Sequence, residues 1–97
     1  MNIEITMSDA TPGAVRAQGD IRIRGKQDDL EEDVRVRVGS PGACALPTGQ
    51  YTYVFGIDRK GTFTLAAVNA ATGAELKSKT YTDALTSDEL RFKFEVP

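Results

Sequence analysis

Arginine is the residue type in this sequence with the clearest capacity for binding chemistry. Half of the twelve basic residues fall within 22 positions: Arg16, Arg22, Arg24, Lys26, Arg35 and Arg37. Guanidinium groups recognise carboxylates and phosphates through paired hydrogen bonds. If the segments 15–24 and 34–38 are neighbouring antiparallel strands, four of these residues share one sheet face. The predicted binding residues are therefore Arg22, Arg24, Arg35 and Arg37.

The alternative interpretation of these arginines is a solvated face without a ligand. Like charges directly opposite one another on neighbouring strands are unfavourable, so acidic side chains are expected between them. Exposed charge pairs contribute little to stability. The acids available for this purpose include Glu4, Glu95 and the segment 28–33.

A second group of chemically capable residues is acidic. Five acids crowd one polar loop: Asp28, Asp29, Glu31, Glu32 and Asp33. Clustered oxygens can bind calcium, and three acids from other turns (Asp9, Asp58, Asp83) could join them. The spacing does not match an EF-hand, which places acids at alternate positions around a glycine. We expect a solvated loop that balances the arginines, and no metal ligand is assigned.

Catalytic chemistry is poorly represented. The chain has no histidine, the commonest general base and transition-metal ligand. Its single cysteine, Cys44, has no base to activate it and stands among apolar neighbours, which predicts a small buried packing residue. No phosphate-binding glycine loop or nucleophile elbow occurs. The sequence therefore predicts a protein that is not an enzyme and has no cofactor.

Size and charge restrict the remaining classes. The 97 residues with 40% hydrophobic content suit one globular domain spanning 1–97. A formal charge of −2 gives no overall drive toward nucleic acid, so no nucleic-acid partner is expected. No stretch has the ~20 apolar residues of a membrane-spanning helix. The sequence assigns neither a cellular location nor an oligomeric state.

Alternation of apolar and polar residues organises the chain. It predicts strands over 2–7, 15–24, 34–38, 51–57, 62–69, 75–81 and 90–96. Turn residues separate them, including Pro12-Gly13 and the Pro/Gly-rich segment 39–47. A bulge is expected near Gly19-Asp20. The strand 62–69 is apolar on both faces near its end and should be central, whereas lysines in 75–81 suit a strand near an edge.

These strands predict an all-β fold: an antiparallel β-sandwich of about seven strands, immunoglobulin-like in the broad sense, with a small closed barrel as the alternative. The run Leu46-Pro47-x-Gly49-x-Tyr51 resembles the turns that open strands in many bacterial immunoglobulin-like and prealbumin-like sandwiches. That resemblance covers six residues. It implies an architecture rather than an activity.

The core should be aliphatic from the early strands and aromatic from the later ones. Tyr51 and Tyr53 share a face with Phe55 and are expected in the core, whereas Tyr81 lies among lysines and is expected to be exposed. The predicted core comprises Ile3, Ile5, Val15, Ile21, Ile23, Val34, Val36, Val38, Tyr53, Phe55, Phe63, Leu65, Leu76, Phe92 and Phe94.

The function predicted from these observations is a non-catalytic interaction module that uses an arginine-rich sheet face. Its partner would be another protein or an acidic surface. Two alternatives stay open: a structural or assembly subunit that self-associates through a sheet edge, and a calcium-dependent surface or adhesion domain.

Overall fold

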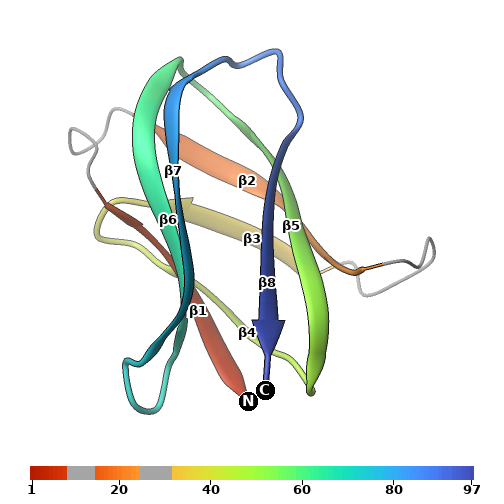
Figure 1. The fold of residues 1–97 in the computed structure, drawn as a ribbon. Coiled ribbons are helices and arrows are strands. Elements are labelled where there is room, and N and C mark those ends of the chain that lie inside the picture. Colours follow the sequence, from red (N-terminus) through yellow and green to blue (C-terminus); the bar gives the residue numbers. More distant parts are fainter. Residues whose placement is uncertain (9–14, 25–31) are drawn as a thin grey trace.

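Two four-stranded antiparallel sheets pack face to face (Figure 1). The computed structural model describes residues 1–8, 15–24 and 32–97; for residue 32 it describes the backbone only. The strands are β1 (Asn2–Ser8), β2 (Arg16–Ile23), β3 (Glu32–Arg37), β4 (Gly42–Ala45), β5 (Gly49–Ile57), β6 (Gly61–Asn69), β7 (Glu75–Ala84) and β8 (Leu90–Val96). Sheet A has the order β4-β1-β6-β7 and sheet B the order β3-β2-β5-β8.

The predicted sandwich is confirmed, and the closed barrel is wrong because the strands form two separate sheets. The structure has one strand more than the seven predicted. The additional strand is β4, which lies within the Pro/Gly-rich segment 39–47 that was expected to connect two strands. Its four residues alternate inward and outward, with Cys44 buried as predicted. Small residues at every position of β4 leave little hydrophobic contrast, which explains why the pattern did not predict a strand there.

The core forms between the inner faces of the two sheets. Stacked rings run through it: Tyr53 lies 4.8 Å from Phe55, and Phe63 lies 5.1 Å from Tyr81, measured between ring centroids. Twelve of the fifteen predicted core residues are buried. Ile23, Val38 and Leu76 are only partly buried, because the first two lie at strand ends and the third near the start of an edge strand.

Gly19 permits the close approach of β2 to β5. A Cβ atom at this position would lie 2.0 Å from the Val54 carbonyl oxygen and 2.5 Å from the Cα atom of Phe55. The expected bulge at Gly19-Asp20 is wrong, since β2 pairs without a register shift with both of its neighbours. This glycine is therefore required for close packing and not for a bend.

The three tyrosines each donate a hydrogen bond to a main-chain carbonyl. The Tyr51 hydroxyl reaches Pro47 at 2.6 Å, four residues upstream, in the manner of the tyrosine corner of β-sandwiches. The Tyr53 hydroxyl reaches Val34 on β3, also at 2.6 Å. Tyr51 and Tyr53 are buried, as predicted.

Tyr81 is also buried, so its expected exposure is wrong. It faces inward opposite Phe63, and its hydroxyl donates to the Arg91 carbonyl at 2.6 Å, which joins β7 to β8. The lysines two and four positions before it, Lys79 and Lys77, point to the same side but lie where this face opens to solvent. Burial raises the pKa of the Tyr81 hydroxyl.

The expected positions of two later strands are confirmed. β6 lies inside sheet A between β1 and β7, and β7 lies at its edge. β7 also continues to Ala84, beyond the predicted end at Tyr81. The turn at 12–13 lies outside the described residues, as do residues 28–31 of the acidic segment. Glu32 and Asp33, which were expected in that loop, instead begin β3.

Candidate functional site: the outer face of sheet B

Basic residues dominate the outward positions of sheet B. They come from β2 and its end (Arg16, Arg22, Arg24), from β3 (Arg35, Arg37) and from β8 (Arg91, Lys93). Against these seven stand three acids at outward strand positions, Asp20, Asp33 and Glu95, and two acids directly beside strand ends, Asp58 and Glu89. Strand alternation explains this arrangement, since each strand buries its apolar set and turns the intervening charged set to the other face.

The register places Arg16 directly opposite Arg37. The Arg16 carbonyl accepts a hydrogen bond from Asp58, beside β5, and the Arg37 backbone exchanges two hydrogen bonds with Ser40. Neither residue therefore uses its backbone toward the other, so they form a non-hydrogen-bonded pair, the type in which facing side chains lie closest. Two basic residues therefore face each other directly at this end of sheet B.

Few acids compensate this pair. Among the described residues, no carboxylate lies within ion-pair distance of the Arg16 or Arg37 guanidinium group. The carboxylate of Asp58 is nearby but accepts a hydrogen bond from the Arg16 main-chain N–H, at 2.7 Å. Arg35, the next outward cation on β3, lies 3.7 Å from Asp33 in an exposed ion pair.

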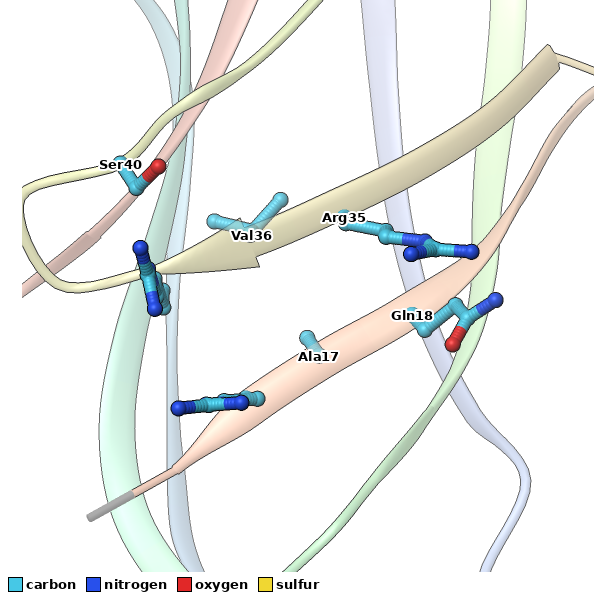
Figure 2. A pocket seen from close by; sticks show the side chains of 7 residues that line it. Ala17, Gln18, Arg35, Val36 and Ser40 are labelled. Carbon is cyan, nitrogen blue, oxygen red and sulfur yellow. The ribbon is translucent and has the colours of Figure 1, made fainter. Parts of the chain in front are cut away.

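A surface hollow of about 390 Å³ lies among these residues. Three arginines line it at this corner of sheet B, together with Gln18 and Ser40; the arginines are Arg16, Arg35 and Arg37. Figure 2 shows the Gln18 and Arg35 side chains extended from neighbouring strands with their ends side by side, and Ser40 toward the opposite end. Guanidinium, amide and hydroxyl groups can all donate hydrogen bonds to an anion placed in the hollow.

A second basic cluster lies on the same face, nearer the other end of β2. Arg22 and Lys93 flank Thr52 of β5 from the two neighbouring strands, in a hollow of about 290 Å³ that Arg24 and Arg91 also line. Arg24 donates to the carbonyl oxygen of Tyr51 at 3.2 Å, and Arg91 pairs with Glu89 at 2.9 Å.

Two aspartates separate the clusters. Asp20 and Asp33 face each other across β2 and β3. Asp20 lies 3.9 Å from Arg22, and Asp33 lies 3.7 Å from Arg35, so each aspartate pairs with one cluster. Of the acids expected to intervene among the arginines, Asp33 from the segment 28–33 does so in this row, together with Asp20, which was not among them. Glu4 does not intervene, because it lies on β1 of sheet A, and the row containing Arg16 and Arg37 has no acid among the described strand positions.

The four predicted binding residues share one sheet face but not one site. Arg35 and Arg37 join Arg16, whereas Arg22 and Arg24 join Arg91 and Lys93. Their role in binding stays a prediction. Arg16 was not among the four predicted residues, and its place opposite Arg37 depends on a register that alternation alone does not determine. Lys26 lies outside the described residues.

Within the described ranges, no group of three or more potential ligands forms a metal site, and no helix has the length and apolar character needed to cross a membrane. Comparisons with protein families, curated proteins and solved structures find no match to this chain.

Proposed function

We propose that this protein is a non-catalytic interaction module that binds an acidic protein surface through the outer face of sheet B. The observation on which the proposal rests is the close pair of Arg16 and Arg37, which has no carboxylate counterpart among the described residues. Facing like charges cost free energy in the isolated protein. An anion bound between them removes that cost, so the arrangement favours an acidic ligand.

The residue types around the pair suit carboxylates. A guanidinium group donates two parallel hydrogen bonds to one carboxylate, and three such groups at one corner can hold neighbouring acidic side chains of a partner. Gln18 and Ser40 add neutral donors at the same hollow. The second cluster, with Arg22 and Arg24, adds a further group of cations on the same face, beyond the row of Asp20 and Asp33.

A direct test measures binding of fluorescently labelled poly-L-glutamate to the wild type and to the double variant Arg16→Glu, Arg37→Glu. Loss of charged hydrogen bonds costs about 1.5 kcal/mol or more each, so affinity should fall by roughly tenfold or more. The wild-type affinity should also decrease as salt is added, because the contacts are exposed.

The matched control is Lys77→Glu with Lys79→Glu, which changes net charge by the same amount on β7 of sheet A. It should lower affinity much less than the arginine variant. An equal loss in both variants would mean that only overall charge matters, and unchanged binding in the arginine variant would exclude this corner as the site. The variant Arg22→Glu, Arg24→Glu then tests whether the second cluster contributes to the same surface.

A further inference from the structure

The sandwich has four edge strands, and among the described residues three of them have features that oppose pairing with another chain. On β3, Arg37 exchanges backbone hydrogen bonds with Ser40, and Gly42 lies against the Arg35 carbonyl oxygen. β4 has only four residues. β7 has register shifts near both ends and turns Lys77 and Lys79 toward the inner face. Short edges, irregular pairing and inward charges all discourage edge-to-edge association.

β8 has none of these features. It pairs with β5 over seven consecutive residues without a register shift, and its inward residues Phe92, Phe94 and Val96 are all buried and apolar. Its outward residues include both signs of charge: Arg91 and Lys93 are basic, and Glu95 is acidic. An edge of this kind is a template for a further strand.

The backbone groups available on β8 follow from the hydrogen-bond pattern. Arg24 donates its main-chain N–H to the Gln50 carbonyl, so Gln50 bonds to β2 and the next residue, Tyr51, bonds to Phe94 on β8. The odd-numbered residues of β8 therefore point their N–H and C=O groups away from β5. The Arg91 carbonyl already accepts the Tyr81 hydroxyl. In the described chain, no hydrogen bond reaches the outward backbone groups of Lys93 or Glu95.

We propose that β8 pairs with β8 of a second copy of this chain, antiparallel about a two-fold axis. In the register that sets Lys93 opposite Glu95 of the second copy, each residue exchanges both backbone hydrogen bonds with its counterpart, and the two-fold axis generates the same pair again. Two opposite-charge pairs then lie on the outer face. A strand that carries both charges of each pair is complementary to itself, as a two-fold interface requires.

Neighbouring registers fit less well. A shift by one pair of residues sets Lys93 against Lys93 of the second copy, which places like charges on the axis. This register also sets Arg91 against Glu95 in both copies, but their backbone exchange needs the Arg91 carbonyl that already accepts the Tyr81 hydroxyl. In the favoured register Arg91 faces Pro97 of the second copy, which has no N–H to donate, and the Arg91 carbonyl keeps its bond to Tyr81. Symmetric pairing about Ser78 on β7 would instead set Lys77 against Lys79 in both copies. Charge therefore favours β8 over β7 as the pairing edge.

Pairing of this kind makes one continuous eight-stranded sheet from two copies of sheet B. The outer faces of both copies, with their arginines, then lie on the same side of that sheet. The inference rests on the β8 edge alone and does not depend on the proposed acidic partner.

Sedimentation equilibrium of the full chain over a wide concentration range tests the proposal. The wild type should show a monomer–dimer equilibrium from 10.5 kDa to twice that mass. Lys93→Glu sets acid against acid and should weaken dimerisation at least tenfold, as should Glu95→Lys, which sets base against base. The double variant Lys93→Glu, Glu95→Lys restores opposite charges and should restore the dimer.

Backbone pairing is tested separately by Lys93→Pro. Residue 93 does not use its N–H toward β5, so the variant should fold, as far-ultraviolet circular dichroism would show, and should be monomeric. The matched control is Ser78→Pro on β7, which should dimerise like the wild type. The proposal is overturned if the wild type is monomeric at every concentration, if the single charge variants dimerise normally, or if Ser78→Pro abolishes the dimer while Lys93→Pro does not.

Discussion

The two outer faces of this sandwich differ sharply in charge. Sheet B presents seven basic side chains, whereas the described strands of sheet A have no basic residue at an outward position. The outward residues of sheet A are mostly small, with Thr64 and Thr80 hydrogen-bonded at 2.8 Å and Ala66 opposite Ser78. Both sheets bury apolar residues on their inner faces, apart from the exposed Lys77 and Lys79 at the edge of sheet A. The arginines are therefore not a requirement of the fold, which supports a role for them in binding.

The largest effect is expected from a change that disturbs the packing between the strands of sheet B. Gly19→Ala places a Cβ atom against the backbone of Val54 and Phe55, which side-chain rotation cannot relieve. We expect a loss of about 3 kcal/mol in the free energy of unfolding, measured by urea denaturation. Gly56→Ala in the same sheet is the control: nothing lies within 4 Å of the added atom, and the change should stay within about 0.5 kcal/mol. Equal effects would contradict the packing role of Gly19.

A smaller effect is expected from the bond that supports β3, the strand of Arg35 and Arg37. Tyr53→Phe removes the hydroxyl bonded to the Val34 carbonyl and should cost about 1 kcal/mol at pH 7. Burial, followed by the negative charges of Asp33 and Asp20, raises the pKa of the Tyr53 hydroxyl.

The raised pKa of Tyr53 also predicts a pH dependence. In the unfolded chain this hydroxyl ionises near its ordinary pKa of about 10, while in the folded protein it stays neutral to higher pH. The wild-type free energy of unfolding should therefore be unaffected by this group below pH ~10 and should fall as pH rises further. Tyr53→Phe should lose less stability over the same range. Parallel pH profiles for the two proteins would contradict this assignment.

Arg16→Glu tests the electrostatic cost of the facing arginines on sheet B. Replacing a facing like-charge pair with an opposite-charge pair should raise the free energy of unfolding by up to about 1 kcal/mol at low salt. The gain should shrink in 1 M salt, since the groups are exposed. Adding Arg37→Glu should cancel the gain. If Arg16→Glu raises the free energy of unfolding and lowers the affinity for poly-L-glutamate, then Arg16 favours binding at the expense of stability.

The smallest effect belongs to the outer face of sheet A. Thr80→Ala removes a cross-strand hydroxyl pair with Thr64 and should cost about 0.5 kcal/mol. Because the pair is uncharged, the loss should be the same at low and high salt. Ser78→Ala, whose residue faces Ala66, serves as the control and should have almost no effect. A marked salt dependence for Thr80→Ala would contradict the neutral character of this pair.

The fold was predictable wherever alternation was strong. Ile3 and Ile5, Val34 and Val36, and Phe92 and Phe94 marked three strands and their buried faces correctly. The strand β4 was not predicted, because its residues are all small and show no alternation between large apolar and polar side chains. Tyr81 was misplaced because its strand turns two lysines to the same side, and only the position of β8 shows that the ring is covered.

The candidate site was only partly predictable. Alternation assigns Arg22, Arg24, Arg35 and Arg37 to one face, but the distances among them depend on the pairing register between β2 and β3. A connection of several residues joins these strands, and its length does not set the register as a two-residue hairpin would. Register is also what places Arg16 opposite Arg37 and Asp20 opposite Asp33, so the division into two clusters was not accessible from the sequence.

The three tyrosine hydroxyl bonds have a spectroscopic consequence. The chain has three tyrosines and no tryptophan, so its intrinsic fluorescence comes from phenol rings alone and is not masked by energy transfer to indole. Tyr51 reports on the corner between β4 and β5, Tyr53 on the contact with β3, and Tyr81 on the junction of β7 with β8. Variants that retain one tyrosine at a time would give each region of the molecule its own emission signal during unfolding or assembly.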